Sequence, residues 1–342
     1  MSALFAKLSG KKTAKDGSSV GLDIGSSSVK VIKLKRLKDN VELVSLGVES
    51  VGLDLVPVLK MLSQENDFKK CNVSVSGSSS ITRYINFPKM NETELKQALK
   101  FEAQKHIPFG IAEVGLDSHI LKNDLPDNKM LVLLAAAKKE LIVQRIKILE
   151  DAALRPGIID MDSMAIINAF MFNYPEDEYF RNKAVAVLNI GASYTSLSIL
   201  DDGIPRLSRD IHIAGNNFTN KLMDNFAFDF DSAEKLKVNP EKEKLGTVAS
   251  AIESVLINLS TEVRTSLDYY ESQNTSSVNK IFLAGGSCCF AGLKDMLSSF
   301  IGVEVELWDP FRKLSLAQTI DAAKAKALSM KFGVAVGLAL RQ

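Results

Sequence analysis

Val20–Lys35 reads VGLDIGSSSVKVIKLK, and it decides how the rest of the chain is interpreted. An apolar run ends at Asp23, a turn follows through Gly25 and three serines, and a β-branched run begins again. Serines in a tight turn present hydroxyls and main-chain N–H groups, and an aspartate that opens the turn can hold Mg²⁺ through water. The stretch predicts a strand–turn–strand hairpin and a candidate phosphate loop, with a plain hairpin turn as the alternative.

The same pattern occurs again in the second half of the chain. Ala184–Leu200 reads AVAVLNIGASYTSLSIL, and aligning Asn189 with Asp23 places Gly191 on Gly25, with small residues after both. A duplicated hairpin, one per half, supplies two loops that can clamp one phosphate chain from opposite sides of a cleft. Chance repetition of a common hairpin is the alternative. We therefore predict two related lobes with a nucleotide between them.

The composition is that of a globular protein. The 342 residues are 46% hydrophobic with a net charge of +1, which allows two domains and argues against nucleic-acid binding. Cys71, Cys288 and Cys289 are too few and too poorly spaced for a disulfide framework or a zinc site. No membrane span or signal peptide is predicted, so the expected compartment is the cytoplasm. The lysine-rich Met1–Asp16 predicts a flexible tail, with contact to an anionic membrane as the alternative.

Strands and helices alternate irregularly in the first half. The patterns predict strands over Val41–Val51, Asn72–Ser76, Ile81–Phe87, Val114–Leu121, Met130–Ala137 and Gly157–Met161, and helices over Leu53–Asn66, Asn91–Ile107, Leu141–Ala153 and Ser163–Phe172. Asn91, with Glu94 three positions later, is typical of a capping box. Three successive strands before the first helix favour a mixed α/β sheet over a doubly wound parallel one.

The second half carries four further features. Lys235–Leu245 alternates Lys and Glu, which is typical of a solvated helix surface. Val248–Glu271 predicts a long amphipathic helix, and Lys280–Ala284 predicts a strand that runs into two glycines, where a flat ring can approach the backbone. Ala322–Leu340 predicts one helix, in which glycines four residues apart permit close packing.

These motifs together resemble the actin/Hsp70/FtsA superfamily. GLDIGSSS at Gly21–Ser28 is similar to its first phosphate motif, and LNIGAS at Leu188–Ser193 is similar to the second. FLAGGS at Phe282–Ser287 is similar to the adenosine motif. The two connecting segments are similar to Met161–Phe170 and Phe332–Leu340. Within the superfamily the chain resembles the PilM family of type IV pilus assembly proteins, because Glu94–Leu121 looks like the subdomain inserted in that family.

The resemblance implies an actin-like two-lobed α/β fold with duplicated mixed-sheet cores and an inserted 1C-type subdomain. The expected divisions are a flexible tail at 1–18, lobe I core at 19–87, inserted subdomain at 88–157, return to lobe I and connection at 158–182, lobe II core at 183–215, small subdomain at 216–262, lobe II core at 263–317 and a C-terminal helix packed on lobe I at 318–342.

The resemblance also implies a cytoplasmic protein that binds ATP and Mg²⁺ between its lobes. It would grip the short cytoplasmic tail of a PilN-like inner-membrane protein, with pilus motor ATPases and self-association as further expected contacts. By motif position, Asp23 would hold Mg²⁺ through water. The expected nucleotide-binding residues are Asp23, Gly25, Ser26, Ser27, Ser28, Lys30, Asn189, Gly191, Ala192, Ser193, Gly215, Asn216, Glu234, Lys237, Gly285, Gly286 and Ser287. For Lys30, an ordinary surface lysine is the alternative.

One position departs from the family pattern. The second phosphate motif usually carries an acid where this chain has Asn189, and an amide supplies no charge to a metal and is a poor base. Asp160 and Asp162 are the candidates for orienting water, with capping of the following helix as the alternative for either. We therefore expect weak or absent ATPase activity, with ATP acting as a structural ligand.

The partner tail is expected in a groove between lobe I and the inserted subdomain, bound by strand addition and apolar pockets. The candidate residues are Tyr84, Phe87, Leu99, Ile107 and Phe109, and ordinary core positions are the alternative for each. Two other functions stay open. One is an FtsA- or MreB-like filament protein, although the chain stops at Arg341–Gln342 without the basic amphipathic helix usual in FtsA-like chains. The other is a small-molecule kinase, for which no second-substrate motif is found.

Overall fold

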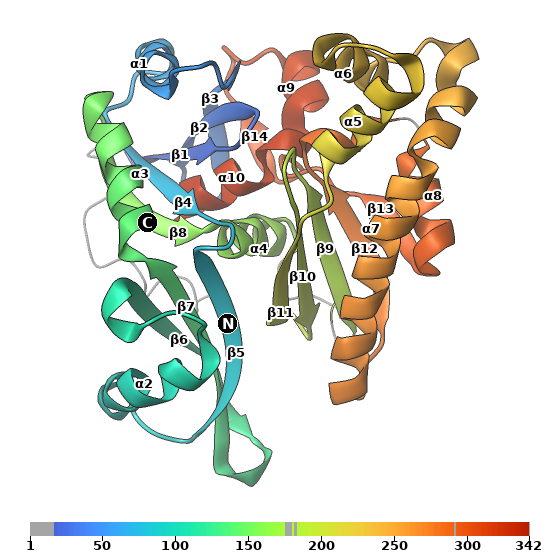
Figure 1. The fold of residues 1–342 in the computed structure, drawn as a ribbon. Helices are drawn as coiled ribbons and strands as arrows, with labels where there is room; N and C mark the ends of the chain where they lie inside the picture. The colour runs from blue at the N-terminus through green and yellow to red at the C-terminus, as the bar shows by residue number, and fades with distance from the viewer. Residues whose placement is uncertain (1–16, 175–179, 181–182, 291, 342) are drawn as a thin grey trace.

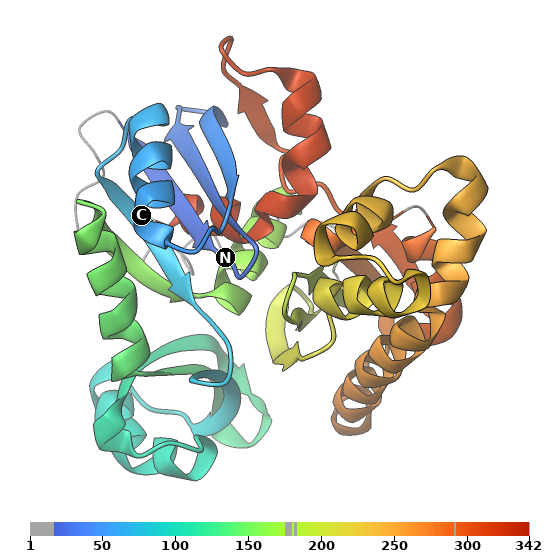
Figure 2. The ribbon, with the colours of Figure 1, turned by 45° about the horizontal axis from the view of Figure 1, so that its top comes forward.

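The computed structural model describes residues 17–174, 180, 183–290 and 292–341, and it divides into two lobes and an inserted subdomain (Figure 1). The predicted tail over 1–16 and most of the charged stretch Glu176–Asn182 lie outside the described residues. Figure 2 shows lobe I and the inserted subdomain stacked on one side of the molecule, with lobe II on the other. In the described ranges, no helix combines the length and the apolar character that crossing a membrane requires.

Lobe I is built on a six-stranded mixed sheet with the order β14-β3-β2-β1-β4-β8. The strands are β1 Ser18–Ile24, β2 Ser28–Arg36, β3 Val41–Ser50, β4 Lys70–Val75, β8 Arg155–Met161 and β14 Leu314–Leu316. The predicted hairpin is formed, β1 and β2 pairing antiparallel with Asp23 opposite Lys30, whereas β4 runs parallel to β1. Apolar residues of α1 (Leu55–Glu65) and α3 (Lys139–Asp151) share one core with β1 and β2.

Lobe II repeats this topology. Its sheet has the order β11-β10-β9-β12-β13, so a meander of three strands is again followed by a parallel strand beside the first one. The strands are β9 Ala184–Ile190, β10 Thr195–Asp201, β11 Ile204–Ile211, β12 Val278–Ala284 and β13 Glu304–Leu307, and the helices are α5 Gly215–Phe226, α6 Phe230–Val238, α7 Leu245–Gln273 and α8 Leu293–Ile301. The duplication predicted from the two hairpins therefore extends to whole sheets.

The inserted subdomain is a three-stranded sheet covered by one helix. Its strands are β5 Ser80–Pro88, β6 Val114–Leu125 and β7 Lys129–Lys138, in the order β5-β7-β6, and its helix is α2 Glu92–His106. The predicted capping box is present, because the Asn91 side chain accepts from the Glu94 amide and the Glu94 carboxylate accepts from the Asn91 amide. The predicted division at 88–157 needs correction, since β5 pairs with β7 along its full length and α3 packs on lobe I.

The C-terminal region differs from the single predicted helix. It forms α9 (Ala322–Leu328), a 3₁₀ turn (Ser329–Phe332) and α10 (Gly333–Leu340). The chain also returns to lobe I before the predicted boundary at 318, because β14 pairs with β3. This strand and β13 were absent from the prediction, since three or four residues are too short to show a period.

Helix α10 lies between β1 and α4 (Asp162–Asn173) at the centre of the molecule (Figure 1). The backbones touch on both sides. A Cβ added to Gly337 would overlap the carbonyl group of Ala165 in α4, and one added to Gly21 in β1 would lie 2.7 Å from the Ala339 nitrogen. The close packing expected from the small residues of this helix is confirmed.

Candidate functional site

The first turn holds a lysine beside an aspartate at the end of β1. Lys30 Nζ lies 3.0 Å from Asp23 Oδ2 and 3.4 Å from the Ser28 carbonyl oxygen, and both charged side chains are nearly buried. The Gly25 amide closes the turn by donating to the Ser28 oxygen at 3.1 Å, and an added Cβ on Gly25 would lie 3.1 Å from Lys30 Nζ. Lys30 is therefore not a surface lysine, because its ammonium group is fixed at the turn.

The second turn meets the first across the two lobes. Gly191 donates its amide to the Tyr194 carbonyl oxygen at 3.1 Å, and the Ser193 hydroxyl donates to Ser26 Oγ at 2.7 Å. These two serines are 167 residues apart in the sequence, and both are exposed. The two matching motifs are thus juxtaposed, with hydroxyl groups from each lobe facing the same point. The structure brings Ser26 and Ser193 together directly.

The third glycine-containing loop supports the second turn. Ser287 donates its hydroxyl to the Gly191 carbonyl oxygen at 2.7 Å, and Gly215 donates its amide to the same oxygen at 3.0 Å. Gly285 has a φ of +113°, and an added Cβ would lie 2.6 Å from the Ile190 nitrogen. The direction that a side chain at Gly285 would take is therefore filled by the Ile190 backbone, which requires glycine at this position. At Gly286 there is room for a side chain, since an added Cβ would lie 4.0 Å from its nearest neighbour, Lys331 Cγ.

A buried polar cluster lies behind this loop. Lys237 Nζ contacts Glu234 Oε2 at 2.5 Å, Thr219 Oγ1 at 2.9 Å and the Gly215 carbonyl oxygen at 3.3 Å. Lys237 is only 4% exposed, so the solvated surface expected over Lys235–Leu245 is wrong for this residue. The cluster joins α6 to the first turn of α5 and fixes Gly215 beside the second phosphate-like turn.

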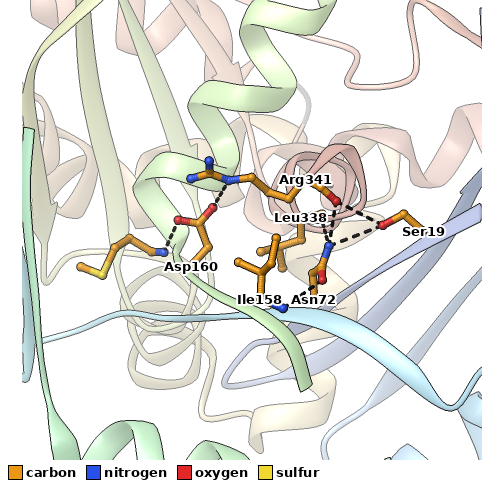
Figure 3. A network of polar contacts seen from close by, with 7 residues as sticks. Ser19, Asn72, Ile158, Asp160, Leu338 and Arg341 are labelled. Atoms are coloured by element: carbon orange, nitrogen blue, oxygen red, sulfur yellow. Dashed lines mark hydrogen bonds and ion pairs between the residues drawn. The ribbon is translucent and has the colours of Figure 1, made fainter. Parts of the chain in front are cut away.

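The two candidate carboxylates have different surroundings. Asp160 Oδ2 accepts from Arg341 Nε at 2.6 Å and Oδ1 accepts from the Met161 amide, in a network that reaches Asn72 and the end of α10 (Figure 3). Asp162 instead accepts from the Tyr194 hydroxyl at 3.3 Å, and its carboxylate also bonds Ser74 and Ser76. Only Asp162 contacts a residue of the two turns.

Burial raises the pKa of Asp162, and the nearby negative charge of Asp23 raises it further. Hydrogen bonds from Ser74 and Ser76 oppose this effect in part. Burial and the charge of Asp162 likewise raise the pKa of Asp210, in β11 of lobe II. Burial therefore disfavours the charged forms of a carboxylate from each lobe, and both residues line the same groove.

Asp162→Asn is expected to stabilise the protein in a pH-dependent way. A folded-state pKa above the unfolded value means that ionisation costs stability as pH rises past the ordinary aspartate pKa of about 3.9. The gain in free energy of unfolding should therefore grow as pH increases and become constant above the folded pKa of Asp162. Urea titrations between pH 4 and pH 8 measure it. Asp39→Asn, at an exposed loop position, is the control, and a gain that shrinks with rising pH would contradict the expectation.

Asp162 and Asp210 line a groove of about 250 Å³. Its walls come from three parts of the molecule: Val75–Ser78 and Met161–Ser163 from lobe I, Ser80–Arg83, Pro108 and Phe109 from the inserted subdomain, and Ser208–Asp210 and His212 from lobe II. The polar residues Ser76, Ser208 and Asp210 were missed in the sequence. Ser76 follows a buried strand, where the carboxyl end of a sheet commonly carries ligand-binding groups, but nothing local marks the other two.

Of the five partner-binding candidates, only Phe109 lines the groove. Phe87, Leu99 and Ile107 are buried at 3%, 8% and 7% exposure in the core between α2 and its sheet, so the core alternative describes them. Tyr84 neither lines the groove nor belongs to that core. Its hydroxyl hydrogen-bonds Ser208 Oγ of lobe II at 2.8 Å, which ties the inserted subdomain to the opposite lobe.

A family model described as type IV pilus assembly protein PilM matches residues 21–342. The chain belongs to the PilM family. A solved structure described as the PilM–PilN type IV pilus biogenesis complex is 27% identical, covers 94% of this chain and 98% of that one, and superposes with a TM-score of 0.84. The ethanolamine utilization protein EutJ from Carboxydothermus hydrogenoformans is 11% identical over 97% of this chain and 92% of its own, with a TM-score of 0.58, and shares the fold alone. The predicted actin-like fold of this PilM-family chain is confirmed.

Proposed function

We propose that this PilM-family chain is a cytoplasmic, ATP-binding scaffold of type IV pilus assembly that holds the N-terminal tail of a PilN-like inner-membrane protein. The observation that carries the proposal is the 0.84 TM-score over 94% of the chain to a PilM solved with PilN. The groove between lobe I, the inserted subdomain and lobe II supports it, because three walls can enclose an extended peptide. The partner would place the protein at the membrane face.

The two turns fit a phosphate chain. Gly25 and Gly191 each allow their turn to close tightly, since an added Cβ would lie 3.0 Å from the Ser28 oxygen at Gly25 and 2.9 Å from the Tyr194 oxygen at Gly191. Ser26 and Ser193 present hydroxyls 2.7 Å apart, and each would bond a phosphate oxygen in place of the other hydroxyl. Lys30 supplies a nearly buried positive charge, and Asp23 beside it would hold Mg²⁺ through water. ATP would supply an anionic chain that joins both turns, and so the two lobes.

The same residues favour binding over hydrolysis. Asn189 carries no charge, and Asp160 is paired with Arg341, so neither side chain is placed to act as a base. ATP would then act as a structural ligand. A ligand that binds only the folded state stabilises it by about 2.7 kcal/mol at a hundredfold excess over its Kd.

Lys30→Met is expected to weaken MgATP binding by about 10- to 100-fold, the value of one lost hydrogen bond between charged groups. Methionine keeps the length of the side chain but removes the only lysine that contacts Asp23 among the described residues. Isothermal titration calorimetry measures the affinity. Lys35→Met, on the same strand but five residues beyond Lys30, is the matched control and should bind as the wild type does. Equal affinity of both variants would contradict the assignment of Lys30.

The groove can receive an extended tail by two means. The strand β5 lies at an edge of its sheet, and its residues Ile81–Arg83 line the groove, so an extended peptide would pair with this edge. Val75, Met161 and Phe109 add apolar surface for peptide side chains. Strand addition provides affinity, and the side-chain pockets provide specificity.

Phe109→Ala is expected to weaken tail binding by about tenfold, because truncating an aromatic residue in an interface commonly costs more than 1 kcal/mol. Fluorescence anisotropy with a synthetic N-terminal tail of the PilN-like partner measures this. Phe101→Ala is the matched control, since Phe101 lies in the same subdomain, is 78% exposed and does not line the groove. If the wild type does not bind the tail, either with or without MgATP, the proposed partner function is overturned.

A further inference from the structure

Tyr194 connects the two turns with the groove. It follows Ser193 in the chain, and its carbonyl oxygen accepts the bond from Gly191 that closes the second turn. Its hydroxyl contacts lobe I instead, where it hydrogen-bonds Ser76 and donates to Asp162 Oδ2 at 3.3 Å. Ser76 and Asp162 both line the groove. One residue therefore contacts both candidate sites, through its main chain at one and its hydroxyl at the other.

Two consecutive residues of the second turn form hydrogen bonds to lobe I. Ser193 bonds Ser26 of the first turn, and Tyr194 bonds Ser76 and Asp162 in the groove wall. A shift of the second turn against lobe I therefore changes both sets of bonds together. Burial, followed by the charge of Asp162, raises the pKa of Tyr194, so its hydroxyl keeps the proton that it donates.

We propose that Tyr194 is a positioning residue that couples nucleotide binding between the turns to peptide binding in the groove, an inference that rests on the proposed function. A phosphate chain that joins the turns favours the arrangement in which lobe II is docked on lobe I. In that docked arrangement the Tyr194 hydroxyl holds Ser76 and Asp162 of the groove wall in place. A peptide in the groove contacts this same arrangement of the wall. By linkage, each ligand then strengthens binding of the other by the same factor.

Tyr84 provides a matched comparison within the same chain. Its hydroxyl also joins the lobes beside the groove, through Ser208 Oγ at 2.8 Å, but it comes from the inserted subdomain and contacts neither turn. Tyr84→Phe removes a tyrosine hydroxyl that bonds across the lobes, as Tyr194→Phe does. The two variants differ in whether the lost bond belongs to a residue of the second turn.

The test is a coupling measurement on the full chain. The Kd of the synthetic tail is determined by fluorescence anisotropy with and without saturating MgATP, and the Kd of MgATP is determined by calorimetry. The wild type should bind the tail about fivefold more tightly with MgATP, at the lower end of typical coupling factors. In Tyr194→Phe the ratio should fall to within twofold of one while each ligand still binds. Ser76→Ala should lower it in the same direction, and Tyr84→Phe should keep the wild-type ratio.

The outcomes separate this inference from the proposed function. If the wild type binds neither MgATP nor the tail, the proposed function fails and the inference fails with it. If both ligands bind and the ratio is one in the wild type, or is unchanged in Tyr194→Phe, only the coupling role of Tyr194 is overturned. An equal loss of coupling in Tyr84→Phe would also overturn it, because inter-lobe contact in general would then be responsible.

Discussion

Gly337→Ala is expected to destabilise the protein by at least about 4 kcal/mol, at the upper end of single substitutions, because backbone would have to move on two sides of one helix. The new methyl group would overlap the Ala165 carbonyl in α4 and lie 2.9 Å from the Ala165 Cα. Helix α10 cannot move away from α4, since Gly21 of β1 already touches its other side. Urea unfolding followed by circular dichroism measures the loss, and yield of folded protein reports it if the variant does not fold.

Two other helical glycines provide a graded control. Gly333→Ala places its methyl group 2.5 Å from Ile166 Cδ1, the end of a flexible side chain, so its cost should be smaller than that of Gly337→Ala. Gly246→Ala meets no atom within 4 Å, so it should change stability by between zero and a gain of about 1 kcal/mol from helix propensity. Equal effects at all three positions would contradict the packing explanation.

Asp160→Ala is expected to cost about 3 to 5 kcal/mol, the typical result of removing one partner of a buried ion pair. Arg341 Nε and Asp160 Oδ2 are 2.6 Å apart, and the two side chains are 12% and 7% exposed. Without the carboxylate the guanidinium group would be left nearly buried and uncompensated. Urea unfolding measures this loss, and the Asp160→Ala/Arg341→Ala double variant should recover part of it.

Controls for Asp160 separate a structural from a catalytic role. Lys105→Ala breaks an exposed pair with Glu102 and should cost less than about 1 kcal/mol. Asp160→Asn, studied at a temperature where it is folded, should bind MgATP as the wild type does, because Asp160 faces the end of α10 rather than the turns (Figure 3). A loss of nucleotide affinity with wild-type stability would contradict the structural role.

Local sequence signals predicted the parts of the fold that depend on them. The turn residues located both hairpins, Asn91 and Glu94 located the start of α2, and the repeated pattern predicted the duplicated sheets. These features depend on residues close together in the chain. The contact between Lys30 and Asp23 could also be predicted from the sequence, because antiparallel pairing across the turn sets the two residues opposite each other.

The remaining features depend on contacts between distant segments. Asp160 and Asp162 are two residues apart and equally acidic, but only the fold places Arg341 beside one and Tyr194 beside the other. The groove combines residues from three parts of the chain, so no single stretch marks it. Lys237 has the charge pattern of a surface residue, and only its packing against α5 shows that it is buried.

The position of α10 also sets an order for folding during synthesis. Lobe II is formed by the continuous segment from β9 to β13, whereas Ser19 in β1 bonds the Arg341 carbonyl oxygen 322 residues later. Lobe I therefore cannot complete its core until that last helix has left the ribosome, while lobe II can form earlier from contacts within its own segment. Lobe I is thus synthesised first but completed last. Until α10 emerges, the face of β1 at Gly21 that this helix covers stays exposed. Exposed apolar surface in such an intermediate favours aggregation and chaperone binding.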